Sequence, residues 1–205
     1  MIVKIGTSKE PGIVISGHID TLRARSSNMP GADDDGSGSV SVLEAARTLL
    51  SSNLHFKKPI YIMWFAAEEE GLVGSQHVVA EFKKQNIPVA HVLHFDMTGY
   101  TPLNDPTMWV VDDNVDLDLT NFLATLITTY VKTPVKHTNC GYACSDHATW
   151  TKNGYSASIA TEAEFGKYDP YLHTPQDTMN ILSLNHMANF SRLATAFAIE
   201  LAEPV

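Results

Sequence analysis

The run Gly12-Ile13-Val14-Ile15-Ser16-Gly17 is followed at once by His18-Ile19-Asp20. The near-continuous apolar run predicts a strand that is buried on both faces, because a half-exposed strand alternates apolar with polar residues. Side chains that can bind a metal or move a proton then stand directly at its carboxyl end. A buried strand that ends in such residues indicates the central sheet of an α/β protein.

Similar apolar runs recur along the chain and alternate with segments of helical periodicity. Strands are expected at residues 60–65, 91–95, 108–111 and 156–160, and helices at residues 37–50, 75–84, 117–130 and 184–201. This alternation predicts a three-layer αβα fold, with helices on both faces of a mostly parallel central sheet. Residues 2–5 and 12–16 flank a turn-rich stretch, which predicts an antiparallel hairpin at one edge and therefore a mixed sheet.

Size and composition indicate a single domain over residues 1–205. The 44% hydrophobic share and 18% charged share are ordinary for a globular domain. The formal net charge of -9 argues against nucleic acid or an anionic membrane as a partner, since both require a basic face. The sequence shows no apolar run long enough to span a bilayer and no signal peptide.

Polar side chains follow several of the predicted strands. Glu68 and Glu69 follow the second strand, Asp96 follows the third, and His173 lies in the aperiodic stretch 161–183. The carboxyl ends of parallel strands meet at one edge of a sheet, so these residues are expected to converge with His18. Histidine, aspartate and glutamate without a thiolate are typical of a catalytic zinc site.

Two further features leave alternatives open. Asp33-Asp34-Asp35 precedes a predicted helix, where a single aspartate is enough to cap the helix, so at least one of the three is a candidate metal ligand. Cys140 and Cys144 are compatible with two free thiols or with a local disulfide that requires an oxidising compartment.

Six segments together resemble one family, the M28 zinc aminopeptidases, and in particular the secreted bacterial leucine aminopeptidases of the Vibrio (Aeromonas) type. The segments are Gly17-His18-Ile19-Asp20, residues 30–38 (PGADDDGSG), Ala66-Ala67-Glu68-Glu69, residues 71–75 (GLVGS), Phe95-Asp96-Met97-Thr98 and residues 173–178 (HTPQDT). Residues 140–147 (CGYACSDH) are specific to the Vibrio-type branch. Family catalytic domains usually carry further N-terminal sequence ahead of residue 1, so that portion is expected to be absent here.

The resemblance implies a role for each candidate residue. Asp34 is expected to bridge two zinc ions, with Glu69 and His173 completing one site and His18 and Asp96 the other. Glu68 is the expected general base, Asp20 supports His18, and Tyr142 helps to stabilise the tetrahedral oxyanion. The family also pairs Cys140 with Cys144 in a disulfide, which favours a secreted or periplasmic location.

The implied substrate pocket is mostly apolar, which predicts a preference for leucine-like first residues. Thr161 departs from the family pattern, in which an aromatic residue is usual at this position. The expected pocket residues are Met97, Val110, Cys140, Tyr142, Cys144, Ile159, Phe165, Tyr168 and Leu172.

The resemblance therefore implies a monomeric aminopeptidase that acts on peptides with a free N-terminus. One alternative is another M28-type hydrolase, such as a carboxypeptidase or a glutaminyl cyclase. The other is a non-catalytic binding module on the same fold. The remaining histidines match no ligand position and are expected to be structural or surface residues: His55, His77, His91, His94, His137, His147 and His186.

Overall fold

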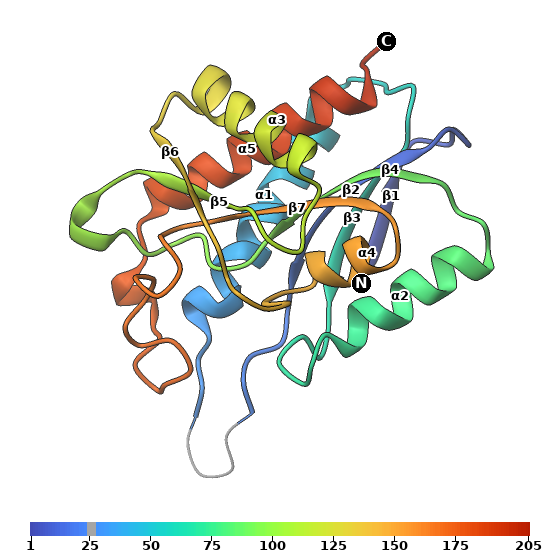
Figure 1. The fold of residues 1–205 in the computed structure, drawn as a ribbon. Coiled ribbons are helices and arrows are strands. Elements are labelled where there is room, and N and C mark those ends of the chain that lie inside the picture. The colour runs from blue at the N-terminus through green and yellow to red at the C-terminus, as the bar shows by residue number, and fades with distance from the viewer. Residues whose placement is uncertain (24–27) are drawn as a thin grey trace.

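Seven strands form one mixed sheet in the order β1-β3-β2-β4-β7-β5-β6 (Figure 1). The computed structural model describes residues 1–23 and 28–205. The strands are β1 (Ile2–Ile5), β2 (Gly12–His18), β3 (Ile60–Phe65), β4 (Val89–Phe95), β5 (Met108–Val111), β6 (Val135–Thr138) and β7 (Ser156–Thr161). Strands β3, β2, β4 and β7 are parallel neighbours, whereas β1 and β5 run antiparallel to β3 and β7.

Helices cover both faces of this sheet, as Figure 1 shows. Helices α1 (Gly38–Ser51), α3 (Leu117–Leu126) and α5 (Leu184–Ala202) pack on one face, and α2 (Val73–Lys84) and α4 (His147–Lys152) on the other. Short helical turns are η1 (Ala32–Ser37), η2 (Pro102–Asn104), η3 (Ile127–Val131) and η4 (Met179–Ile181).

Strand β2 shows why its sequence is almost continuously apolar. Ile13 and Ile15 belong to the core cluster with α1 and α5, while Val14 belongs to the cluster with α2 and α4. Successive side chains of a strand point to opposite faces, so a strand between two helical layers must be apolar at every position. The predicted three-layer αβα fold with a mixed, mostly parallel sheet is confirmed.

The predicted hairpin between residues 2–5 and 12–16 is wrong. Strand β1 pairs antiparallel with β3, not with β2. Both edges of β2 are occupied by the parallel partners β3 and β4, which leaves β1 only the outer edge of β3. The sequence prediction also missed β6 and α4, which are too short and too polar to show a clear periodicity.

The parallel arrangement brings four strand ends to one edge of the sheet. Strand β2 ends at His18, β3 at Phe65, β4 at Phe95 and β7 at Thr161. The loops that leave these strands therefore start side by side. Among the helices of the described residues, none is both long and apolar enough to cross a membrane.

His147, the first residue of α4, is fully buried. Neither of its ring nitrogens has a hydrogen-bond partner among the described residues. Burial lowers the pKa of His147 to about 3, against a smaller opposing effect of the Asp113 charge. The side chain is therefore neutral in the folded protein at pH values where it would be protonated in the unfolded chain.

We expect His147 to make the fold sensitive to acid. A depressed folded-state pKa contributes stability above the unfolded pKa of about 6.5, and this contribution is lost as the pH falls towards about 3, with a slope of at most about 1.4 kcal/mol per pH unit. The free energy of unfolding, measured by denaturant titration, should therefore change less between these pH values in His147→Gln than in the unaltered chain. His77→Gln, at an exposed position of α2, is the matched control. An unchanged pH slope in His147→Gln would contradict this role.

Candidate metal centre

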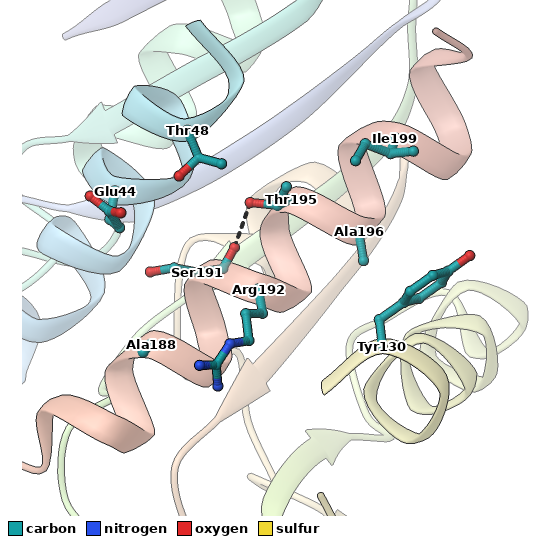
Figure 2. Close-up of a pocket in the computed structure, with 9 residues that line it drawn as sticks. All are labelled: Glu44, Thr48, Tyr130, Ala188, Ser191, Arg192, Thr195, Ala196 and Ile199. Carbon is teal, nitrogen blue, oxygen red and sulfur yellow. Dashed lines mark hydrogen bonds between the residues drawn. The ribbon is translucent and has the colours of Figure 1, made fainter. Parts of the chain in front are cut away.

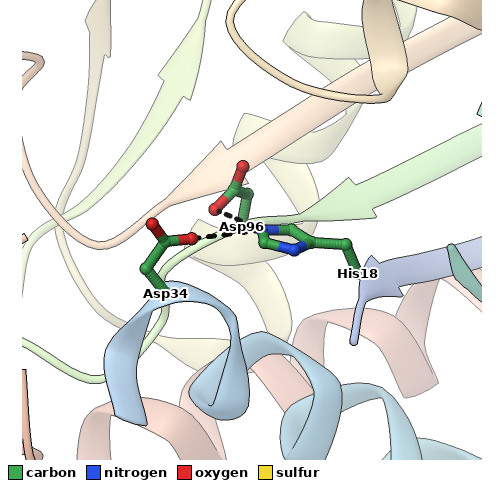
Figure 3. Close-up of side chains that lie close together, drawn as sticks. All are labelled: His18, Asp34 and Asp96. Atoms are coloured by element: carbon green, nitrogen blue, oxygen red, sulfur yellow. Dashed lines mark ion pairs between the residues drawn. The ribbon is translucent and has the colours of Figure 1, made fainter. Parts of the chain in front are cut away.

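His18 lies at the carboxyl end of β2 and points at two carboxylates (Figure 3). Its Nε2 atom is 3.1 Å from Asp34 Oδ1 and 3.6 Å from Asp96 Oδ1. The ligand atoms of the three residues lie within 4.8 Å of one another. Although it is buried, His18 Nε2 makes no hydrogen bond within the described part of the chain. A ring nitrogen directed at two carboxylate oxygens without a hydrogen bond fits a shared metal ion.

A second group of three ligand atoms shares Asp34 with the first. Asp34 Oδ2 is 3.0 Å from His173 Nε2, which is in turn 3.1 Å from Glu69 Oε2. These atoms also lie within 4.8 Å of one another. The two oxygens of Asp34 thus face different groups, as a carboxylate that bridges two metal ions requires.

The charges of the site fit a cation in each group. The pKa of His18 is lowered by burial but raised more strongly by Asp96, Asp20 and Asp34, so its net shift is upward. Hydrogen bonds to Asp34 and Glu69 raise the pKa of His173 to about 10. The carboxylates therefore favour protonated imidazoles, which supply positive charge to the site. A divalent cation can take over that role when the protons leave.

Asp20 connects His18 with the two glutamates. His18 Nδ1 donates to the backbone oxygen of Asp20 at 3.1 Å, which leaves Nε2 as the ligand atom. The carboxylate of Asp20 accepts hydrogen bonds from the backbone N–H of Glu68 at 3.1 Å and of Glu69 at 3.2 Å. One aspartate thereby orients a candidate metal ligand and fixes the strand-end loop that carries both glutamates.

Asp35 is buried and accepts several hydrogen bonds, a role that the sequence analysis did not assign to it. Its carboxylate accepts hydrogen bonds from the N–H groups of His18 (2.9 Å), Gly38 (3.0 Å) and Met97 (3.1 Å). It therefore joins the ends of β2 and β4 to the start of α1. A Cβ atom at Gly38 would lie 2.1 Å from Asp35 Oδ1, so only glycine fits there. Asp35 thus accepts from the first residue of α1, whereas Asp34 belongs to both candidate metal groups.

Two other acids hold the loop that carries His173. Asp177 accepts hydrogen bonds from the N–H of Asp33 at 2.8 Å and of Asp34 at 3.2 Å. Glu162 is fully buried and accepts hydrogen bonds from the N–H of Tyr100 at 2.6 Å and of Asp169 at 3.4 Å. Glu162 directly follows β7, so the rule that acids at strand ends are functional could have found it, whereas no spacing in the sequence singles out Asp177.

A cavity of about 280 Å³ opens beside both metal groups. Glu68 lines it and is half-buried. Burial, and next the negative charge of Asp96, raise the pKa of Glu68 to about 9. Bound cations would oppose this shift and return Glu68 to the range of a working base.

Eight of the nine predicted pocket residues line this cavity. They are Met97, Cys140, Tyr142, Cys144, Ile159, Phe165, Tyr168 and Leu172, and Thr161 lines it as well. Val110 does not: it is fully buried in the core cluster, and its neighbour Val111 lines the cavity instead. Adjacent residues of a strand face opposite sides, so the prediction was displaced by one residue.

Comparison with known proteins decides the family. The model of peptidase family M28 matches residues 1–198, nearly the whole chain. The chain belongs to peptidase family M28. This membership confirms the resemblance inferred from the strand-end motifs.

Several relatives of this M28 chain carry names that describe an activity. It is 40% identical to "Leucine aminopeptidase 1" of Sclerotinia sclerotiorum, over 98% of this chain and 55% of the relative. The crystal structure of the Legionella pneumophila LapA aminopeptidase superposes with a TM-score of 0.95 at 56% identity, over 98% of this chain and 55% of LapA. A zinc aminopeptidase from Bacillus subtilis gives 0.81 at 28% identity, over 97% and 48%. The chain thus spans about half the length of these relatives.

More distant structures share only the fold. A glutaminyl cyclase from Porphyromonas gingivalis is 18% identical, with a TM-score of 0.83 over 97% of this chain and 76% of the cyclase.

Cys140 and Cys144 of the M28 chain form a disulfide, as the resemblance implied. It closes a loop whose Tyr142 side chain remains 60% exposed. The ring of Tyr142 packs edge-on against Phe165, with centroids 6.0 Å apart, and Phe165 packs in the same way against Tyr168. These three aromatic rings form one wall of the cavity.

The seven histidines that match no ligand position lie outside both metal groups in the described residues. His94 is an example: it is fully buried, with its ring nitrogens 3.0 Å from Ser16 Oγ and 2.9 Å from Ser145 Oγ.

A second hollow of about 450 Å³ lies between α1, α5 and Tyr130 (Figure 2). Its lining residues are Glu44, Thr48, Tyr130, Ala188, Ser191, Arg192, Thr195, Ala196 and Ile199. It shares no residue with the metal groups, so the chemistry of the M28 chain is assigned to the smaller cavity at the strand ends.

Proposed function

We propose that this chain is the catalytic domain of a two-zinc aminopeptidase that removes an apolar, leucine-like residue from the N-terminus of peptides. One observation supports this most directly: two groups of metal ligands share Asp34 beside a largely apolar cavity. The names of the Sclerotinia, Legionella and Bacillus relatives point to the same activity.

The geometry supports one assignment of the ligands. His18 and Asp96 would hold one zinc ion with Asp34, and Glu69 and His173 would hold the other. Zinc bound there supplies Lewis acidity, which polarises the scissile carbonyl and makes water acidic enough to lose a proton near neutral pH.

Glu68 is the group that moves the proton. It lies beside the ligands without belonging to either group of three. In hydrolysis, Glu68 takes one proton from the attacking water while the oxygen bonds to the carbonyl carbon. It then delivers that proton to the leaving nitrogen as the C–N bond breaks, so the carboxylate is regenerated.

Tyr142 is suited to donate a hydrogen bond. Burial, together with the nearby Tyr168, Asp96 and Glu68, raises the pKa of Tyr142 above its ordinary value. Its hydroxyl therefore keeps its proton at neutral pH and can stabilise the negative oxygen that develops on the substrate carbonyl.

The cavity favours aminopeptidase chemistry over the alternatives. Among the described residues that line it there is neither Lys nor Arg to bind a substrate carboxylate, as a carboxypeptidase needs. Zinc held by Asp34, Glu69 and Asp96 would instead offer a position for a free, neutral N-terminal amine, which an internal peptide bond does not offer. The apolar and aromatic lining suits a leucine-like side chain, and Thr161 makes one side of it more polar.

We further propose that the protein acts as a monomer in a secreted or periplasmic location. The support for the location is the Cys140–Cys144 disulfide, since such bonds persist in oxidising compartments.

The purified chain should bind two zinc ions, and Asp34→Asn should lose both because each group needs that carboxylate. His173→Ala should lose only one ion. Elemental analysis after dialysis measures the stoichiometry, and His137→Ala, an exposed residue outside both groups, is the control. A single zinc ion in the unaltered chain would refute the two-zinc assignment.

Glu68→Gln should keep both zinc ions and lower kcat by about 10²–10⁴-fold, the usual contribution of a general base. Glu70→Gln is the matched control, because Glu70 is exposed and lies outside the cavity lining. Steady-state hydrolysis of leucyl anilide measures the effect. Equal kcat in the two variants would exclude Glu68 as the base.

A panel of aminoacyl anilides tests the substrate class. We expect kcat/KM to be at least about tenfold higher for leucyl than for glutamyl anilide, because the apolar wall cannot pair a buried carboxylate. N-acetyl-leucyl anilide, which lacks the free amine, should not be hydrolysed, and a zinc chelator should abolish all turnover. Cleavage of the acetylated substrate would contradict exopeptidase action.

A further inference from the structure

The loop 140–144 has to present Tyr142 to the cavity although it lies outside the helices and strands of the fold. Its disulfide joins Cys140 to Cys144, two residues of the same loop, and does not tie the loop to the sheet. Because the ring of Tyr142 is exposed, burial also does little to fix its position. Another interaction must therefore fix the loop.

Asp113 and Asn114 supply that interaction from the segment between β5 and α3. The two carboxylate oxygens of Asp113 accept hydrogen bonds from the N–H of Cys140 at 2.8 Å and of Gly141 at 2.7 Å. The side-chain amide of Asn114 donates to the backbone oxygen of Tyr142 at 3.0 Å. Three consecutive loop residues are thus held by two consecutive side chains, and two of the bonds are strengthened by the charge of Asp113.

Asp113 and Asn114 directly follow a hydrogen-bonded part of the sheet. Strands β5 and β6 are parallel, with Val111 opposite Thr138, and the N–H of Asp112 donates to the oxygen of Thr138 at 2.9 Å. Asp113 is the next residue. Thr138 Oγ1 also accepts from the N–H of Phe165 at 3.1 Å. The same strand pair therefore positions Phe165, the ring against which Tyr142 packs.

We propose that Asp113, assisted by Asn114, is a positioning residue that fixes Tyr142 over the reacting carbonyl. This inference rests on the proposed function, because it assumes that Tyr142 stabilises the oxyanion. Asp113 itself does not line the cavity, so it acts on the reaction only through the loop.

Asp113→Ala should lower kcat on leucyl anilide on the order of tenfold to a hundredfold, the range for a misplaced transition-state donor, with a much smaller change in KM. Zinc content should not change. Asp113→Asn, which keeps one acceptor oxygen, should retain an intermediate kcat. Asp112→Ala is the matched control: its carboxylate binds His137 Nδ1 at 2.8 Å and makes none of the loop contacts described here, so kcat should stay unchanged.

A double-mutant cycle with Tyr142→Phe separates positioning from general loss of structure. In the Y142F background, Asp113→Ala should have little further effect on kcat, because the hydroxyl that it positions is gone. If Asp113→Ala lowered kcat by the same factor in both backgrounds, the proposal would be overturned. An unchanged kcat in Tyr142→Phe would also overturn it.

Hydrogen exchange gives a readout that does not depend on catalysis. In Asp113→Ala the amides of Cys140 and Gly141 lose their acceptor, so a peptide covering residues 139–144 should exchange faster than in Asp112→Ala. Equal exchange would also overturn the proposal. If the unaltered chain hydrolyses no anilide, the proposed function fails, whereas this measurement still tests how the loop is held.

Discussion

Negative charge crowded at one edge of the sheet is the constraint on which the rest of the structure depends. Asp34, Asp35, Glu69 and Asp96 meet there in surroundings that are largely shielded from water. An uncompensated buried carboxylate costs several kcal/mol, so each must have a partner. Asp35 is satisfied by three backbone N–H groups. The other carboxylates face the two histidine rings, and their need for positive charge makes the edge a candidate metal centre.

The same charges organise the backbone around them. Backbone N–H groups are common hydrogen-bond partners of buried side chains. The carboxylates of this site accept from N–H groups of segments that are far apart in the sequence. Asp35 joins the ends of β2 and β4, Asp20 joins β2 to the loop after β3, and Asp177 joins the His173 loop to the segment before α1. The hydrogen bonds that satisfy these acids therefore also bring the ligand-bearing loops together. Stability and site geometry share the same interactions.

The sequence predicted most of this centre because its residues stand at strand ends, where the fold class alone brings them together. His18, Glu69 and Asp96 can be grouped in this way from the sequence alone. Asp35 and Asp177 could not, since their contacts depend on the backbone path through η1 and through the loop after β7. The error of one residue at Val110 has a similar origin: a strand pattern that is apolar at every position does not show which face a residue takes. The predicted pairing of β1 with β2 was wrong because an edge strand of four residues carries too little sequence pattern to identify its neighbour.

The two hydrogen bonds between Asp20 and the glutamates have a consequence for how the sequence of the site can vary. Glu68 and Glu69 are chemically identical neighbours, and only their place along the chain separates the proposed base from the proposed ligand. The N–H groups of the two glutamates donate to different oxygens of Asp20, which fixes the position that each glutamate takes in the loop. Gain of one residue between Phe65 and Glu68 would move Glu68 towards the position of Glu69 and Ala67 towards that of Glu68, while leaving the composition of the site almost intact. Such a change would be nearly silent in an inventory of site residues, yet it would leave no carboxylate at the position proposed for the base.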